Sequence, residues 1–337
     1  MKFKKWLMPA GVLLLTAGLI GFPEAASAGA LRGLRVCGCA LIPALLPYFV
    51  VSRLLIACTD LRALNLRAEK PMRRFFGVEG GCITALLTSF LGGYPAGAAA
   101  VVQLYERGVI GKQSAERALR FCNNSGPGFF LGVAGGMVLD SIPAGLALYG
   151  IHVLSALCAG ILFASAEAPR AVVRTIKPQE PLTFPRAFSE AVSGSCEALL
   201  QISGLVIFFT ALSSLLQQAL PQLPAQGLLT GLLELTSGIT RCEGDWNTRF
   251  LTCSFLLGWG GLCVHFQAFV LWGAAGLHVC GYWAEKLLHG LFSVLFAAAF
   301  LSKRPSAIAL AGGIIGFCVI FPVLRKKRAG NLRSVVV

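Results

Sequence analysis

Long stretches without a charged residue set the strongest limit on what this chain can fold into. Nine of them divide the sequence, at 6–23, 36–52, 80–105, 121–139, 141–166, 198–233, 250–284, 287–302 and 305–324. Most could cross the hydrocarbon core of a bilayer, which takes about 20 residues of helix. Only 13% of the residues are charged, whereas soluble domains carry about 25%. The pattern predicts an all-α integral membrane protein.

The basic residues indicate the orientation of the chain rather than a nucleic-acid partner. The net charge is +14, but binding to nucleic acid would need a basic face on a soluble module. When the expected helices are laid out from a cytoplasmic N-terminus, 22 of the 29 Lys and Arg, Lys286 among them, fall on the cytoplasmic side and six fall outside. This bias is the positive-inside pattern of membrane proteins. We therefore expect both termini in the cytoplasm and no nucleic acid as a partner.

The uncharged stretches predict about eight transmembrane helices and two re-entrant hairpins. The helices are expected near 6–22, 37–58, 118–138, 143–165, 190–217, 250–272, 281–301 and 306–324. Two further stretches do not fit as simple spans, because 80–104 contains the glycine-rich sequence TSFLGGYPAGAAA and 226–240 is too short to cross twice. Hairpins of this kind are tolerated at membrane depth when they are buried in protein or line a cavity.

The first 28 residues also have the form of a secretory signal. Three lysines precede an apolar run, and Ala26-Ser27-Ala28 offers a cleavage site. An uncleaved first helix is favoured here, and cleavage stays open as the alternative.

Two halves of the chain repeat one order of elements. Each runs from a long helix through a hairpin and a glycine-broken helix to a plain helix, over 37–165 and again over 190–301. Residues 1–36 are expected to form a first transmembrane helix and an external segment, 166–189 a cytoplasmic linker, and 302–337 the last transmembrane helix and a basic tail. The first hairpin opens from the cytoplasm and the second from outside, so the repeats are predicted to be inverted. Inverted repeats with discontinuous helices place a substrate near the bilayer midplane, and chance similarity is the alternative.

The most specific segment is RFCNNSGPGF at 120–129, where polar and helix-breaking residues interrupt a run long enough to span. Pro127 removes a backbone donor and disfavours helical geometry at Gly126. Amides, a hydroxyl and freed carbonyls then become available to a solute or cation, from Asn123, Asn124 and Ser125. A proline kink satisfied by neighbouring helices is the alternative.

The second half has a counterpart in the glycines around Gly260, followed by His265 and Gln267. Gly260 and Gln267 are predicted to contact the substrate, although glycines also serve close helix packing in membranes. His265 is a candidate coupling residue, with a hydrogen-bonded interior histidine as the alternative.

The hairpin tips add polar groups and a carboxylate. Substrate-binding residues are expected at Ser89, Gly93 and Tyr94 in the first tip and at Thr236 and Ser237 in the second. Glu234 is the sharper feature, because an ionisable group at membrane depth is costly and marks a functional site by default. We expect it to gate transport or to couple it to H⁺ or Na⁺, with an interfacial carboxylate as the alternative. Glu197, on the polar stripe of the 190–217 helix, is a further coupling candidate.

The sequence gives no sign of an enzyme, a cofactor or a metal centre. It contains neither a G-x-x-x-x-G-K-[ST] loop nor an H-E-x-x-H pair. The 12 Cys include no C-x-x-C pair and lie mainly in apolar segments, where a thiol acts as a small hydrophobe. Transport would therefore be driven by a gradient or a partner.

One stretch of the sequence resembles a known family. The segment SFLGGYPAGAAAVVQLYERGVIGKQSAERALRFCNNSGPGFFLG, residues 89–132, resembles the YlbJ family of sporulation integral membrane proteins from endospore-forming bacteria. The GGYPAG tip, the SAERALRF helix start and the NNSGPGFF break stand in the family's order, and the likeness continues upstream through LIPALLPYFVVSRLL. It weakens in the second half, where GWGGLCVHFQ departs from the pattern.

The resemblance implies a reduced form of the nucleoside-transporter Gate architecture. It also implies a multi-pass protein of the cell membrane, with a forespore membrane as one location, that moves a small anion such as dipicolinate between mother cell and forespore. Three functions stay open: a transporter or permease of a small anionic solute, a non-transporting scaffold for spore maturation, and a nucleoside transporter. A transporter needs a polar cavity joining Asn123 to Glu234, whereas a scaffold leaves these groups scattered or tied up in packing. The expected partners are the solute and membrane lipid, and a homo-oligomer stays open.

Overall fold

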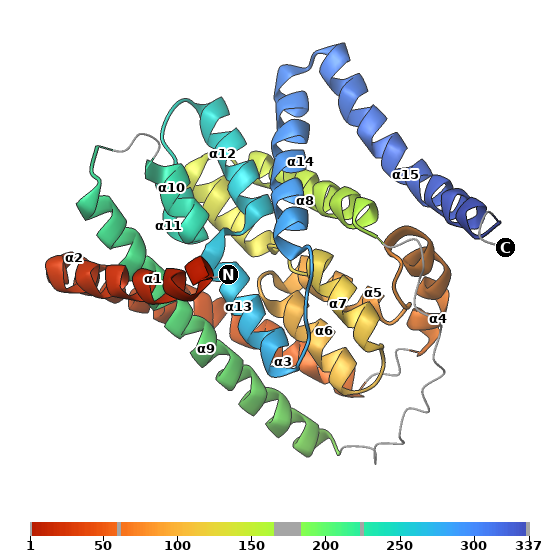
Figure 1. The fold of residues 1–337 in the computed structure, drawn as a ribbon, viewed down its shortest axis with the longest axis horizontal. Coiled ribbons are helices and arrows are strands. Elements are labelled where there is room, and N and C mark those ends of the chain that lie inside the picture. Colours follow the sequence, from red (N-terminus) through yellow and green to blue (C-terminus); the bar gives the residue numbers. More distant parts are fainter. Residues whose placement is uncertain (1, 59–61, 165–182, 223–225, 335–337) are drawn as a thin grey trace.

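The computed structural model describes residues 2–58, 62–164, 183–222 and 226–334, which form helices joined by turns and contain no strand (Figure 1). The predicted all-α fold is confirmed. Most of the predicted linker at 166–189 lies outside the described residues.

Five helical runs in the described residues are long and apolar enough to cross a membrane. They comprise α8 (Ile142–Leu162), α9 (Phe184–Ala219), α12 (Trp246–Trp259) together with α13 (Gly261–Ala274), α14 (Tyr282–Ser302) and the apolar part of α15 (Pro305–Ser334). A sixth consists of α1 (Lys2–Gly21) and α2 (Pro23–Val36), which bend by 98° where they meet. A multi-pass membrane protein is confirmed, whereas the number of eight spans stays a prediction. Only shorter apolar helices form at the predicted spans 37–58 and 118–138.

The first long helical run begins earlier than expected from the sequence. From α2 it continues through the π-helical segment η1 (Cys37–Leu41) into α3 (Ile42–Cys58). On α2, a Cβ added to Gly29 or Gly33 would lie 2.7 Å from the backbone of α9. This Gly-x-x-x-Gly spacing lets two membrane helices approach closely. Residues 23–36, predicted as an external segment, thus form a helix packed on α9, and their side of the membrane stays a prediction.

The two halves of the fold share one order of elements. The first half continues with α4 (Arg62–Pro71), η2 (Met72–Phe76), the hairpin of α5 (Cys82–Gly92) and α6 (Ala96–Glu106), then α7 (Lys112–Phe121), η3 (Phe129–Val138) and α8. The second half runs from α9 through the hairpin of α10 (Gln226–Leu233) and α11 (Leu235–Ile239) to the α12–α13 pair and α14. Both hairpins form where the sequence placed them. Their re-entry into the membrane, the inverted relation of the halves and the domain limits stay predictions.

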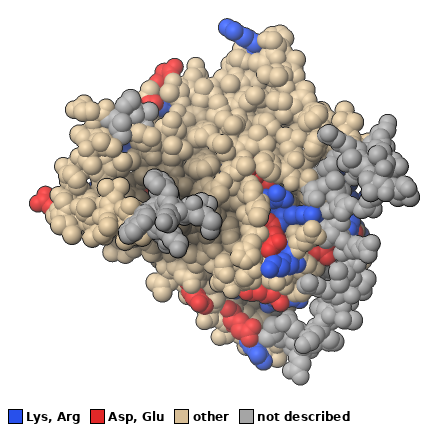
Figure 2. Space-filling view, viewed as in Figure 1, with Lys and Arg blue, Asp and Glu red and all other residues tan. Residues whose placement is uncertain are grey.

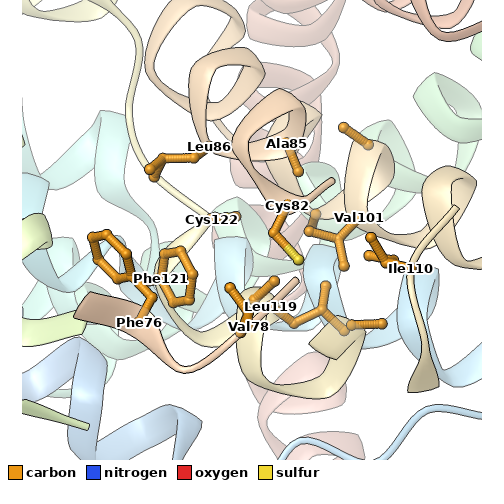
Figure 3. Close-up of a cluster of buried hydrophobic side chains, with 14 of the residues drawn as sticks. Phe76, Val78, Cys82, Ala85, Leu86, Val101, Ile110, Leu119, Phe121 and Cys122 are labelled. Carbon is orange, nitrogen blue, oxygen red and sulfur yellow. The ribbon is translucent and has the colours of Figure 1, made fainter. Parts of the chain in front are cut away.

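A cluster of buried hydrophobic side chains anchors the first hairpin to α7 (Figure 3). The rings of Phe76 and Phe121 stack with centroids 4.7 Å apart. Cys82, Ile110 and Leu119 are fully buried beside them. Because Phe121 is the last residue of α7, this packing fixes the point at which the helix ends.

The surface is largely uncharged, as expected of a protein that faces lipid. Figure 2 shows charged residues gathered mainly in the lower right part of this face, with a basic tip where α14 turns into α15. Large apolar side chains are exposed on several helices, including Leu146 on α8, Leu200 on α9 and Leu310 on α15. Apolar surface of this extent suits contact with lipid tails rather than water.

Candidate functional site

The first broken helix is interrupted where the sequence predicted. Residues 122–126 between α7 and η3 are not helical. The tip of the first hairpin lies directly on this break, since a Cβ added to Gly126 would lie 2.9 Å from the backbone nitrogen of Gly93. Two residues without side chains allow two backbones to approach this closely.

The second broken helix is interrupted by a pair of glycines. Gly260 and Gly261 have φ values of 92° and 78°, in the left-handed region that glycine adopts at little cost. Tyr94 of the first hairpin tip reaches this break, because its hydroxyl donates to the carbonyl of Leu257 at 2.9 Å. The residues Gly93 and Tyr94 thus join the two breaks, and the two predicted interruptions lie near each other.

A cavity of about 270 Å³ lies where the hairpin tips and the first break meet. Polar or backbone groups from both halves line it, from Gly93, Tyr94, Ser125, Glu234, Thr236 and Gln267. Most of the remaining lining is apolar, including Leu45, Phe129, Val206 and Val264. A largely apolar pocket with a few converging polar groups is the usual form of a small-molecule site, and ligand pockets measure about 300–1,000 Å³. The cavity therefore suits a small solute.

Glu234 is the charged side chain of the described cavity lining. It is 4% exposed and immediately precedes α11, where its carboxylate accepts the backbone N–H groups of Thr236 at 3.0 Å and Ser237 at 2.7 Å. A side-chain oxygen in this position satisfies donors left free at the start of a helix. Glu234 is thus a helix cap that also faces the cavity, and its coupling role stays a prediction.

The other predicted site residues stand outside the cavity lining. They are Ser89, Asn123, Asn124, Ser237, Gly260, His265 and Glu197. Of these, Glu197 is exposed on α9.

The two asparagines of the first break are fully buried and bonded within the protein. The amide of Asn123 donates to the Tyr282 hydroxyl at 2.8 Å. The amide of Asn124 donates to Ser89 Oγ at 3.0 Å and to the carbonyl of Phe121 at 2.7 Å. Their donors therefore hold the break in place, and the side-chain oxygens of both residues are buried without a partner in the described structure.

A buried cluster of ionisable groups on α14 and α8 was not predicted from the sequence. Lys286, counted above with the basic residues of the cytoplasmic side, is 1% exposed and lies inside α14. The buried face of this helix holds Tyr282, Glu285, Lys286, His289 and Ser293. Their spacing is that of one helix face. That pattern was the signal available in the sequence, whereas a count of basic residues by membrane side does not show which face of a helix a lysine occupies.

Lys286 joins the cluster to the first break. Its ammonium nitrogen donates to the carbonyl of Asn123 at 2.7 Å and lies 3.3 Å from Nδ1 of His289. It also stands over the ring of Tyr94, 5.3 Å from the centroid. His289 Nε2 lies 3.1 Å from the carbonyl of His152, and the two histidine rings are 4.5 Å apart.

His152 and Tyr282 extend the network on either side. His152 Nε2 accepts the backbone N–H of Ser125, a cavity-lining residue, at 3.1 Å. The Tyr282 hydroxyl lies 3.0 Å from Nδ1 of His265. The bonds therefore run from the cavity wall to both halves of the protein.

A separate ion pair lies next to Lys286 in sequence. Glu285 is 2% exposed and its Oε2 is 3.7 Å from Nε of Arg120 on α7. A buried carboxylate is tolerated when a cation lies this near. Glu285 is therefore held beside two cations, Arg120 and the neighbouring Lys286.

The apolar helices, the paired breaks and the buried polar network define a multi-pass integral membrane protein with an internal cavity. No model of a protein family matches the sequence, and no solved structure matches it. The protein "Sporulation integral membrane protein YlbJ" of Bacillus subtilis (strain 168) is 26% identical over 335 residues, covering 88% of this chain and 82% of the relative. The chain is thus similar to a member of the YlbJ family over most of its length, as the motifs of its first half indicated. The Gate architecture stays a prediction.

Proposed function

We propose that this protein is a secondary transporter or permease of a small solute and that the cavity between its broken helices is the solute site. The observation that carries the proposal is the cavity itself, which receives Tyr94 and Ser125 from the first half and Glu234 and Gln267 from the second. Discontinuous helices that meet between two repeats are the usual setting of a substrate site in secondary transporters. The proposal includes no catalytic step.

The proposed solute is a small anion such as dipicolinate, and the proposed setting is sporulation. The name of the Bacillus subtilis relative supports the setting, and the solute comes from the family resemblance. The lining offers aromatic rings at Tyr94 and Phe129 and hydrogen-bonding groups at Ser125, Thr236 and Gln267. A flat solute with polar edges fits such a wall, and a nucleoside shares these features.

A non-transporting scaffold is the second candidate. The bonds of Asn123 and Asn124 favour it, because a scaffold would tie up the polar groups of the break within the protein. The cavity favours transport instead, since a purely structural junction has no need of space between its hairpin tips.

Uptake into proteoliposomes tests the proposal with two matched variants. Gly128 lines the cavity and Gly150 is exposed on α8, and an added Cβ meets no atom within 4 Å at either position. Gly128→Phe should fill the cavity and abolish uptake of dipicolinate, whereas Gly150→Phe should transport like the wild type. Equal uptake by the two variants would place the solute path elsewhere. A folded wild type that takes up neither dipicolinate nor a nucleoside favours the scaffold.

A further inference from the structure

Lys286 is a buried cation that forms no close ion pair in the described part of the chain. Among the described residues no Asp or Glu oxygen lies within 4.0 Å of its nitrogen. A carbonyl, a histidine nitrogen and an aromatic face surround it instead. An ammonium taken out of water and left without an opposite charge is costly. The structure therefore keeps a titratable group in a place where its charge is only partly compensated.

We propose that Lys286 is the proton-coupling site of this carrier, which takes up one proton when an anion occupies the cavity and releases it when the cavity empties. The inference rests on the proposed transport function and adds the regulation of that site. The proton enters from water when the anion binds, and it returns to water after the anion has left. Charge is therefore conserved in the step.

The position of Lys286 relative to the cavity supports this coupling. Tyr94 lines the cavity, and the Lys286 nitrogen stands over its ring. Tyr94 therefore contacts both the cavity and the ammonium. Opposite charges attract more strongly in a protein interior than in water. The occupied cavity therefore favours the ammonium, and the empty cavity favours the neutral amine.

The neighbours of Lys286 can bond to both of its forms. As an ammonium it donates to the carbonyl of Asn123 and to Nδ1 of His289. As a neutral amine it still carries two N–H groups and can donate to the same two acceptors, while Nε2 of His289 donates to the carbonyl of His152. Gain or loss of the proton therefore requires no rearrangement of the helices.

The remaining charged and titratable groups around Lys286 do not replace it. Its own helix α14 contributes Tyr282, Glu285 and His289. The packed elements contribute His152 from α8, Tyr94 from the first hairpin and Arg120 from α7. His265 of α13 is bonded to Tyr282. Glu285 lies 3.7 Å from Arg120 and also attracts Lys286, so it compensates the charge of Lys286 only in part. On α12, Arg249 lies at the far end and donates to the carbonyl of Val138, and on α15 Cys318 donates to Cys158. Lys286 is left as the charge that an anion in the cavity can balance.

Binding of dipicolinate as a function of pH tests the inference on the purified full chain. From about pH 6 to about pH 9 the carboxylates of this probe stay ionised, so a change in affinity reports on the protein. If binding takes up one proton, the affinity should fall about tenfold for each unit by which the pH rises above the pKa of the empty site. Calorimetry in two buffers of different ionisation enthalpy should count close to one proton per anion bound.

Three variants separate Lys286 from its alternatives. Lys286→Met should bind dipicolinate with an affinity that does not change with pH. Lys286→Arg should also lose the pH dependence but should bind dipicolinate tightly, since a guanidinium keeps its proton. Lys303→Met removes the same charge from an exposed position at the end of α14 and should behave like the wild type. Thermal unfolding of each variant shows which of them are folded.

The outcomes distinguish this inference from the proposed function. If Lys286→Met keeps the wild-type pH dependence, or Glu234→Gln abolishes it, Lys286 is not the coupling site while transport stands. A wild type that binds dipicolinate without taking up a proton also overturns the inference alone. A folded wild type that neither binds nor transports dipicolinate overturns both.

Discussion

The packing of the first hairpin on the first break can be tested at Gly97 of α6. A Cβ added there would lie 1.9 Å from the carbonyl oxygen of Cys122 and 2.3 Å from Cβ of Ser89. Contacts below 3.0 Å essentially never occur for real Cβ atoms, and neither neighbour is the flexible end of a long side chain. Gly97→Ala must therefore move the hairpin away from the break by about 1 Å. Overpacking of this kind costs about 1–3 kcal/mol.

The same displacement should break the hydrogen bond between Asn124 and Ser89, which has a typical net worth of about 1 kcal/mol. We therefore expect Gly97→Ala to lower the free energy of unfolding in detergent by roughly 2–4 kcal/mol and to weaken binding of dipicolinate. Gly150→Ala is the matched control, because nothing lies within 4 Å of its added Cβ. Alanine should stabilise that helix interior by up to about 1 kcal/mol. A Gly97→Ala protein as stable as Gly150→Ala would refute the packing described here.

Three further substitutions test other parts of the site by the free energy of unfolding. Tyr94→Phe should cost about 1 kcal/mol, because it removes the bond to Leu257 and leaves the ring in place; no loss would mean that the hairpin tip does not depend on the second break. Glu234→Gln should also cost about 1 kcal/mol, since an amide can accept only one of the two N–H groups that the carboxylate accepts; a larger effect of Thr236→Ala would argue against a capping role. Arg120→Met should lower the free energy of unfolding by on the order of 3 kcal/mol, because it removes the cation nearest to Glu285. Adding Glu285→Gln to Arg120→Met should restore most of this free energy, whereas additive losses from the two substitutions would exclude the ion pair.

The breaks and hairpins could be predicted because they depend on local backbone chemistry. Pro127 cannot donate a helical hydrogen bond, and the glycines at 260–261 adopt backbone angles that other residues avoid. Long uncharged stretches likewise define apolar helices whatever their neighbours are. The cavity was anticipated in part, since Ser125 and Glu234 both line it.

The direction of individual side chains could not be predicted in the same way. Asn123 and Asn124 looked available to a solute, but tertiary packing places Tyr282 and Ser89 within their reach. An amide near a fixed partner bonds to it rather than to an empty cavity. The helix at 23–36 and its packing were missed for a related reason, because Gly29 and Gly33 become an interface only once α9 lies beside them.

The buried lysine and the broken helix depend on each other physically. In an unbroken helix the carbonyl of Asn123 would accept the N–H four residues further on, but that position is Pro127, which has none. The carbonyl is therefore free, and Lys286 donates to it at 2.7 Å from a helix more than 150 residues away in sequence. A buried ammonium needs such an acceptor, and a buried free carbonyl needs such a donor. Without the break Lys286 would lack its shortest bond, and without Lys286 the break would hold an unsatisfied carbonyl. The residues that interrupt the helix thus also make a buried charge tolerable beside the cavity.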